Sequence, residues 1–312
     1  KKQLLIPMNN SSKYLGYIAL FSLFGMTGFV FGAMNTQVTT PDSTEQQASA
    51  VAAITKAYDF SDIAVHAKAA YVFDIQKNQI IFGKNESAQL PLASITKIPV
   101  ALLAKKYLQS NELITISESS LIPEGDWGFI VGETWRMQDL LDYTLMTSSN
   151  DGITAIAEAI EKRTGEHILD LLKAQSEEIG LSQTFFLNET GLDSSLRLSG
   201  AYGSAEDVGM LFTYAYNMAP EILSATALTT KTFTNATGKE YNANNTNKAI
   251  SELPGLVFGK TGFTDLAGGN LAVVTESEPG HPFVVVVLGS TVDDRFGDVI
   301  ALMHKTLREP VQ

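Results

Sequence analysis

Apolar residues follow two different spacings along the chain. Short apolar runs at residues 70–74 and 79–82, separated by a turn-length segment, predict a β-hairpin. A helical spacing of apolar residues then predicts several helices, at residues 94–108, 137–146, 151–163, 168–180 and 205–216. In the last third, apolar and β-branched runs between Gly, Pro and acidic turns predict strands at residues 256–261, 270–275 and 283–289, and a last helix at 295–307.

The order of these elements predicts the fold class. A hairpin comes first, helices fill the middle, and three strands with one helix follow. Strands from both ends of the body would then form one sheet, with a helical region inserted between them. This is an α+β arrangement.

The segment at residues 14–34 is apolar and uncharged, and lysines precede it at positions 1, 2 and 13. A helix of this length can cross a hydrocarbon core of about 30 Å. Lysines on its N-terminal side predict a cytoplasmic N-terminus. We therefore expect a single-pass protein of the cell membrane, with residues 1–13 in the cytoplasm, 14–34 as the transmembrane anchor, 35–58 as a flexible linker, and 59–312 as an extracytoplasmic domain. A cleaved signal peptide and a buried helix of a soluble protein are the alternative interpretations.

Composition narrows the chemistry. The formal net charge is −12, and a nucleic-acid-binding protein needs a basic face, so no nucleic-acid partner is expected. The chain has no cysteine, which excludes disulfides and thiolate nucleophiles. Its four histidines lie far apart and outside any HExxH pattern. We therefore expect no metal site and no cofactor.

The first candidate motif is Ser94-Ile-Thr-Lys97, an S-x-x-K. Residues three apart on a helix share a face, so the Ser94 hydroxyl and the Lys97 amine can meet. A lysine can act as the base for a serine if burial or a neighbouring cation lowers its pKa enough to leave some neutral amine. The pair therefore indicates a serine nucleophile, although S-x-x-K alone is a common pattern.

The second motif is Ser148-Ser149-Asn150, an S-x-N. It supplies a hydroxyl that can pass a proton and an amide that can bond a lysine and a substrate. The same residues, placed before a helical run, are also typical of an ordinary helix N-cap.

The third motif is Lys260-Thr261-Gly262, at the end of an apolar run. We interpret it as part of an edge strand with a cation, a hydroxyl and a glycine that lets a ligand approach the backbone. A phosphate-binding P-loop at residues 255–261 is the competing interpretation, but its spacing is one residue too short and no helix is predicted after it.

These three motifs in this order resemble those of penicillin-binding proteins and class A β-lactamases. Residues 60–309 are similar to the low-molecular-mass D-alanyl-D-alanine carboxypeptidases, the serine peptidases of family S11. The stretches that carry the resemblance include PLASITK at 91–97, SSND at 148–151, SAED at 204–207 and GKTGFTDLAG at 259–268. A small departure is Ser149, where many members have glycine.

The resemblance implies a β-lactamase/transpeptidase-like fold, an antiparallel sheet flanked by helices beside an all-helical region, with the site in the cleft between them. It implies a serine D,D-carboxypeptidase that removes the terminal D-Ala from peptidoglycan stem peptides. β-Lactams are then expected as covalent inhibitors.

The resemblance also implies catalytic roles. Ser94 would be the nucleophile and Lys97 its base. Ser148 would pass a proton to the leaving amine, and Asn150 would position Lys97 and the substrate. Lys260 would favour an ionised Ser148 and attract the substrate carboxylate.

The remaining implied roles concern substrate binding. Thr261 would bond the terminal carboxylate, and Gly262 would let the substrate approach the strand. The backbone N–H groups of Ser94 and Phe263 would form the oxyanion hole. Arg295, just before the last predicted helix, would help to hold the carboxylate, because arginine can bind a carboxylate through two hydrogen bonds. A surface ion pair between Arg295 and Asp298 is the alternative.

Three other functions share these motifs. A D,D-endopeptidase would cut peptidoglycan cross-links with the same residues. A class A β-lactamase would add a Glu-x-x-Leu-Asn loop, which we do not find at the expected place. A sensor domain would bind β-lactams or peptidoglycan without turnover.

Overall fold

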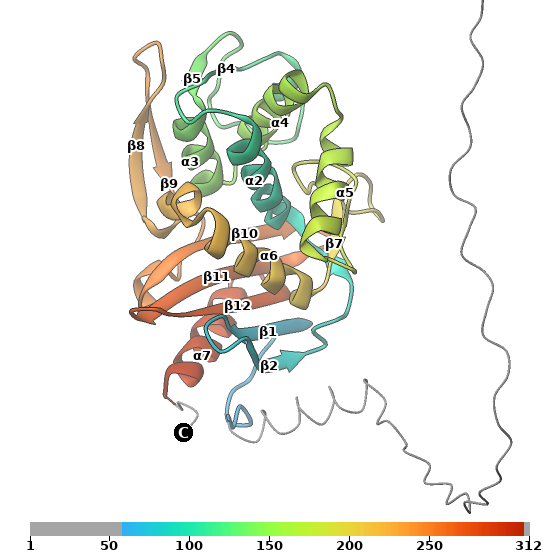
Figure 1. Ribbon diagram of the computed structural model, residues 1–312, viewed down its shortest axis with the longest axis vertical. Coiled ribbons are helices and arrows are strands. Elements are labelled where there is room, and N and C mark those ends of the chain that lie inside the picture. Colours follow the sequence, from blue (N-terminus) through green and yellow to red (C-terminus); the bar gives the residue numbers. More distant parts are fainter. Residues whose placement is uncertain (1–57, 309–312) are drawn as a thin grey trace, which may run out of the picture. The chain divides into compact units, whose positions relative to one another are not determined.

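The computed structural model describes residues 58–308. Its main sheet has five antiparallel strands, which are in spatial order β10 (Leu256–Thr264), β11 (Gly268–Glu278), β12 (His281–Ser290), β1 (Ala69–Asp74) and β2 (Gln79–Lys84). The β1–β2 hairpin therefore pairs with the last strand of the chain (Figure 1). The prediction of one sheet built from both ends of the body is confirmed.

Strand β12 lies at the centre of this sheet, between β1 and β11. Val284 and Val286 belong to the core that the sheet shares with the helical region. Val285 and Val287 point to the opposite face and belong to a second core. A strand buried on both faces is apolar at every position instead of alternating, which explains the unbroken run of valines.

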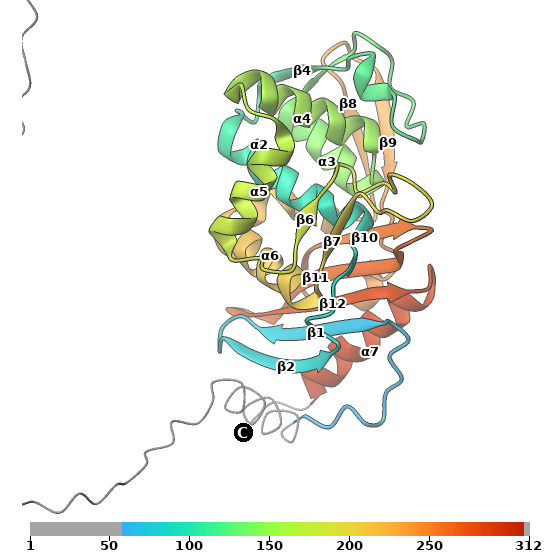
Figure 2. The ribbon, with the colours of Figure 1, turned by 90° about the vertical axis from the view of Figure 1, so that its right-hand side faces the viewer.

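Helices cover both faces of the sheet. Helix α7 (Asp294–Arg308) packs into the second core through Val299 and Leu302. Helix α6 (Ala205–Met218) covers the other face. Gly209 allows this close packing, since a Cβ at that position would lie 2.6 Å from the ring of Tyr71 on β1. Figure 2 shows the sheet between these two layers.

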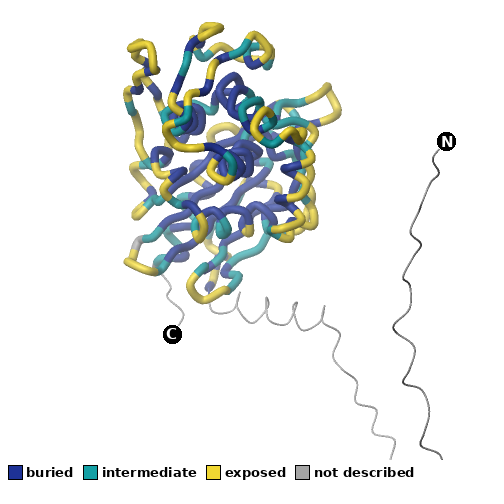
Figure 3. Tube along the Cα trace, turned by 45° about the horizontal axis from the view of Figure 1, so that its top comes forward, coloured by how far each residue is buried: buried dark blue, intermediate teal, exposed yellow. Residues whose placement is uncertain are grey.

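The helical region is built around α2 (Lys97–Tyr107). Residues 97–104 of this helix are all buried, because neighbouring elements leave no face of it to solvent. The other helices of the region are α3 (Met137–Thr147), α4 (Asn150–Thr164) and α5 (Ile168–Ile179). Figure 3 shows the buried segments gathered in the interior and the exposed ones in the outer loops.

The start of the first predicted helix was wrong. Residues 93–96 form the 3₁₀ helix η1 (Ala93–Thr96), and the α-helix begins only at Lys97. The Ile95 N–H donates to the Leu92 carbonyl three residues back, which is the hydrogen-bond pattern of a 3₁₀ helix, and Ala93 has a left-handed φ of +49°. Pro99 then falls in the first turn of α2, where its missing N–H costs no helical hydrogen bond.

Several short elements were not predicted. The hairpin of β8 (Thr230–Thr234) and β9 (Glu240–Asn244) is mostly polar, and its buried residues are Phe233, Tyr241 and Ala243. The remaining short elements are β3 (Leu90–Pro91), β4 (Leu113–Thr115), β5 (Thr134–Arg136), β6 (Phe185–Phe186), β7 (Ala201–Gly203), η2 (Ser119–Leu121), η3 (Pro220–Ala227) and η4 (Ile250–Glu252). Strands of two or three residues are too short for a periodic pattern to show.

Among residues 58–308, none of the helices combines the length and the apolar character that crossing a membrane requires. The anchor predicted at residues 14–34 and nearly all of the linker predicted at 35–58 lie outside the described residues.

Candidate active site

The junction of η1 and α2 brings Ser94 and Lys97 together. Ser94 lies in η1, and Lys97 is the first residue of α2. The Lys97 Nζ donates a hydrogen bond to the Ser94 Oγ at 2.8 Å. The Lys97 side chain is fully buried. The serine and the amine therefore face each other away from bulk water.

Burial changes the protonation of Lys97. It lowers the pKa of the amine to about 7, and the nearby Glu189 carboxylate only partly opposes this effect. The Lys97 Nζ also donates to the Asn150 Oδ1 at 2.8 Å and to the Thr190 carbonyl at 2.9 Å. A neutral amine keeps two N–H groups for these acceptors and turns its lone pair to the Ser94 hydroxyl. Lys97 is thus placed to accept the serine proton.

A second serine and lysine form a parallel pair. Ser148 closes α3 in a left-handed conformation with a φ of +63°, and its Oγ accepts a hydrogen bond from the Lys260 Nζ at 2.8 Å. The neighbouring Ser149 caps α4, where its Oγ accepts from the Gly152 N–H. The N-cap interpretation therefore applies to Ser149, and the hydroxyl of Ser148 faces Lys260.

Lys260 is buried beside two other cations. Burial lowers its pKa well below the ordinary value, and the positive charges of Lys97 and Arg295 lower it further. Its Nζ also donates to the Thr261 carbonyl at 2.9 Å. A lysine with this pKa can exchange a proton with Ser148 instead of acting only as a fixed charge.

Strand β10 is the edge strand that carries the third motif, as predicted. The Thr261 Oγ1 lies 2.6 Å from the Thr246 Oγ1. A Cβ on Gly262 would lie 2.8 Å from the Leu92 carbonyl oxygen and 3.3 Å from the Ser94 nitrogen. Only glycine therefore lets β10 approach the segment that carries Ser94. Phe263 is half exposed at the end of this motif.

Arg295 does not form the surface ion pair considered as an alternative. Only 7% of Arg295 is exposed, and its Nη1 donates to the Gly262 carbonyl at 2.8 Å. The Asp298 carboxylate instead accepts hydrogen bonds from the backbone N–H groups of His66 and Ala67. The alternative pairing of Arg295 with Asp298 is therefore wrong.

A cleft of about 340 Å³ opens beside these groups. Its lining residues are Glu124, Gly125, Asn150, Leu192, Asp193, Phe263, Thr264 and Asp265. Asn150 comes from the helical region and Phe263 from the sheet, so the cleft lies between these two parts of the fold.

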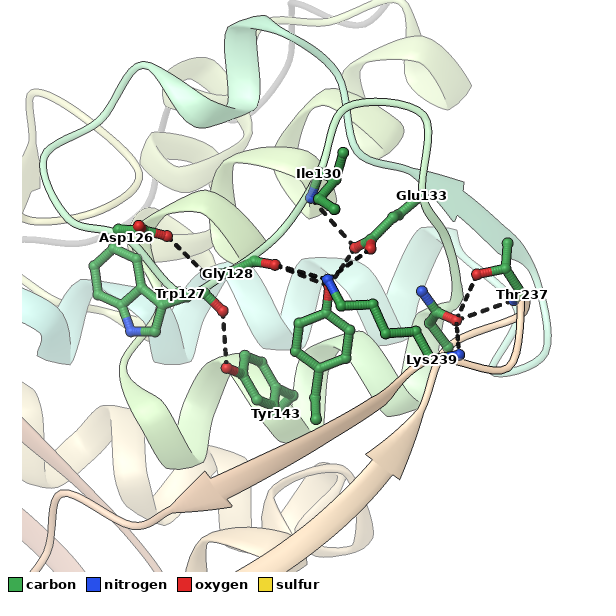
Figure 4. A network of polar contacts seen from close by, with 10 residues as sticks. Asp126, Trp127, Gly128, Ile130, Glu133, Tyr143, Thr237 and Lys239 are labelled. Carbon is green, nitrogen blue, oxygen red and sulfur yellow. Dashed lines mark hydrogen bonds and ion pairs between the residues drawn. The ribbon is translucent and has the colours of Figure 1, made fainter.

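The loop at residues 122–132 forms one wall of the cleft. The Asn150 Nδ2 donates to the Glu124 carbonyl at 2.7 Å. Farther along, the Lys239 Nζ donates to the Gly128 carbonyl at 3.1 Å and to Glu133 at 3.0 Å (Figure 4). Lys239 comes from the turn between β8 and β9, so the unpredicted hairpin holds the wall in place.

Motif reasoning assigned no role to two groups that complete the site. Thr190 contributes its backbone carbonyl to Lys97, and Thr246 contacts Thr261. No side-chain motif marks a backbone acceptor. The sequence marks this part of the site only through nearby turn residues such as Gly191. Its φ is +79°, and a Cβ added at this position would collide with the Ala93 carbonyl.

Two serine–lysine pairs between an antiparallel sheet and a helical region define a protein of the β-lactamase/transpeptidase-like class. The family model of the D-alanyl-D-alanine carboxypeptidases, peptidase family S11, matches residues 50–292. The chain belongs to this family, as its motifs predicted.

Known proteins similar to the chain agree with this assignment. DacF, a D-alanyl-D-alanine carboxypeptidase of Bacillus subtilis, is 29% identical over 255 residues, which cover 78% of this chain and 62% of DacF. The chain thus spans about three fifths of that relative. Penicillin-binding protein D2 of Listeria monocytogenes, in its ampicillin-bound form, has a TM-score of 0.65 at 24% identity, over 78% of this chain and 98% of that one. A D-alanyl-D-alanine carboxypeptidase of Mycobacterium tuberculosis has a TM-score of 0.70 at 21% identity, over 81% and 96%. These structures confirm the predicted fold.

Proposed function

We propose that the protein is a serine D,D-carboxypeptidase that removes the terminal D-Ala from peptidoglycan stem peptides through an acyl-enzyme on Ser94. The observation that carries the proposal is the contact between Ser94 and a fully buried Lys97 whose pKa is lowered to about 7. A base is most effective when its pKa lies near the working pH. At neutral pH this lysine is neutral in a substantial fraction of molecules.

In the proposed acylation step, Lys97 takes the proton of Ser94, and the Ser94 Oγ attacks the carbonyl carbon between the two D-Ala residues. The backbone N–H groups of Ser94 and Phe263 stabilise the oxyanion. Ser148, whose hydrogen-bond partner is Lys260, passes its proton to the leaving amine, and the proton that Lys97 took from Ser94 replaces it, so Lys97 is neutral again before deacylation. Water then hydrolyses the ester, and Lys97 serves again as the base.

The terminal carboxylate of the substrate would lie against β10. Thr261 offers a hydroxyl and Lys260 an amine that donates hydrogen bonds; both side chains are buried, and the Lys260 amine contacts Ser148. Arg295 adds a cation behind the strand. Neutralising this carboxylate by amidation should therefore lower kcat/KM for the peptide.

β-Lactams would acylate Ser94 in the same way. The relative from Listeria monocytogenes has been solved with ampicillin and with cefotaxime bound, which supports this proposal. The acyl group would persist, because the leaving amine stays attached and blocks the approach of water.

Incubation with a pentapeptide that ends in D-Ala-D-Ala and, separately, with a cross-linked muropeptide tests the function. Mass spectrometry should show loss of one D-Ala from the pentapeptide. Cleavage of the cross-link alone would favour the D,D-endopeptidase. Binding of penicillin without turnover of either peptide would favour the sensor.

We also propose that residues 14–34 attach the protein to the cell membrane, with the catalytic domain on the extracytoplasmic side. The uncharged apolar run and the lysines that precede it support this proposal. Peptidoglycan lies on the same side of the membrane.

A further inference from the structure

We propose that Arg295 positions the oxyanion hole. Its guanidinium holds the Gly262 carbonyl, and this carbonyl belongs to the same peptide group as the Phe263 N–H. Arg295 would thereby aim and polarise the N–H that stabilises the oxyanion. The inference rests on the proposed serine acyl-transfer function and adds to it a role different from binding the substrate carboxylate.

The geometry of the peptide group links the two residues. All peptide bonds in the described part of the chain are trans. A trans peptide directs its C=O and N–H to opposite sides. The Gly262 C=O turns toward Asn270, its partner on the neighbouring strand. There the Arg295 Nη1 lies 2.8 Å from the Gly262 carbonyl oxygen and 3.5 Å from the Asn270 backbone carbonyl oxygen. The Phe263 N–H therefore points away from β11, to the free edge of the sheet.

The position of Arg295 makes this contact strong. Arg295 comes from the first turn of α7 and is 7% exposed, so water does not compete well for its N–H groups. A hydrogen bond from a charged donor is roughly twice as strong as one between neutral groups. Withdrawal of electron density from the carbonyl oxygen also makes the N–H of the same peptide a better donor. Arg295 can therefore strengthen the Phe263 N–H without touching the substrate.

The other oxyanion donor is fixed to the same part of the sheet. The Asn270 Nδ2 donates to the carbonyls of Pro91 and Leu92, at 2.9 and 3.1 Å, just before Ser94. Gly262 pairs with Asn270 across β10 and β11. The positions of the Ser94 and Phe263 N–H groups therefore both depend on the Gly262–Asn270 pair. A shift of the Gly262 carbonyl would change the distance between these two donors.

The two possible roles of Arg295 predict different kinetics. An arginine that only binds the carboxylate matters only for substrates that carry one. An arginine that positions the oxyanion hole matters for every acyl donor, because each one develops negative charge on the same oxygen. A substrate without a carboxylate separates these roles.

The test is the rate of acylation by a peptidyl-D-Ala methyl ester, which has no carboxylate. Arg295→Ala should lower kcat for this ester by about 10–100-fold with little change in KM, because small displacements of catalytic groups cost up to about 100-fold. Arg295→Gln, which keeps an N–H donor but no charge, should lose less. A wild-type rate for Arg295→Ala would overturn the proposal.

Two controls address folding. Arg163→Ala removes a half-exposed arginine that is paired with Glu112 at the end of α4 and should keep the wild-type rate. Circular dichroism verifies that each variant is folded. If Arg295→Ala does not fold, Arg295→Gln must show the slower rate, and a folded Arg295→Gln with the wild-type rate would overturn the proposal.

A spectroscopic readout tests positioning directly. The acyl-enzyme formed with a ¹³C-labelled carbonyl has an infrared stretching band that moves to lower frequency as the oxyanion hole donates stronger hydrogen bonds. In Arg295→Gln this band should move to higher frequency or broaden. An unchanged band would overturn the positioning role. A wild-type protein that forms no acyl-enzyme with any donor would instead contradict the proposed function itself.

Discussion

At the residue scale, the proposed chemistry depends on two buried lysines, each of which faces a serine. Ser94 contacts Lys97, and Ser148 contacts Lys260. Burial lowers the pKa of both amines, and the positive charge of Lys97 lowers the pKa of Lys260 further. One amine can therefore be neutral while the other carries the positive charge that a substrate carboxylate requires.

The pH dependence of acylation follows from Lys97. In the proposed mechanism the neutral form of Lys97 is the active one, so the rate of acylation should rise with pH up to about 7 and level off above it. The measurement is the rate of penicillin acylation by stopped flow between about pH 5 and pH 9. Lys97→Ala should lower the plateau by about 10²–10⁴-fold and remove the rise near pH 7. A wild-type rate that falls as the pH increases through 7 would contradict the role of Lys97 as a base.

The sequence predicted the motif residues because their side chains carry the chemistry. Ser94, Lys97 and Asn150 come together in the structure through one amine. The carbonyl of Thr190 completes the same site but leaves no mark on the sequence, because any residue has a carbonyl. The contact of Arg295 with the Gly262 carbonyl could not be predicted for the same reason.

At the element scale, helix ends place the reactive groups of the first two motifs. The S-x-x-K spacing predicts one helical face, but the structure uses a 3₁₀ turn followed by an α-helix to bring Ser94 and Lys97 together. The S-x-N motif combines the end of α3 with the cap of α4. The regular helices were predicted well because the helical spacing of their apolar residues extends over ten or more residues. The β8–β9 hairpin was missed because it buries few residues.

Asp151, in the first turn of α4, is a buried carboxyl group that lowers the stability of the fold when it is ionised. It is 3% exposed, and its Oδ1 has no hydrogen-bond partner. Burial raises its pKa from 3.8 to about 6, while a backbone hydrogen bond from Trp127 opposes the shift. Folding therefore disfavours the ionised carboxylate, and the protein carries this cost wherever Asp151 is ionised.

We expect Asp151→Asn to increase the free energy of unfolding at pH 7.5 by about 1–3 kcal/mol, because one pKa unit corresponds to about 1.4 kcal/mol. The gain should be complete above pH 6 and absent below about pH 4, where Asp151 is protonated in both states. Denaturant unfolding at the two pH values measures it. An equal gain at both pH values would show that removal of the charge is not the cause.

At the scale of the whole molecule, the sheet joins both ends of the described body, so the two halves of the site depend on one core. Strand β10 supplies Lys260, and the helical region supplies Ser148. The element order was enough to predict this arrangement, because strands at both ends of an α+β body can bury their apolar faces in one shared sheet. The cleft walls could not be predicted, because they depend on how loops such as residues 122–132 are held.

The proposed anchor predicts the behaviour of the full chain in cells. The protein should sediment with membranes, and high salt should not release it, because a transmembrane helix inserts through apolar contacts. N-terminal sequencing should recover a chain that retains residues 14–34. A mature chain that begins after residue 34 would favour a cleaved signal peptide and contradict the anchor.

The central claim is that Ser94 is the nucleophile of a D,D-peptidase, and labelled penicillin tests it most directly. Peptide mapping by mass spectrometry should find the adduct on Ser94, and the adduct should outlive the acyl-enzyme of a D-Ala-D-Ala peptide by orders of magnitude. Ser94→Ala should abolish labelling, while Ser149→Ala should not. Labelling that persists in Ser94→Ala, or rapid release of penicilloic acid by the wild-type protein, would contradict the account.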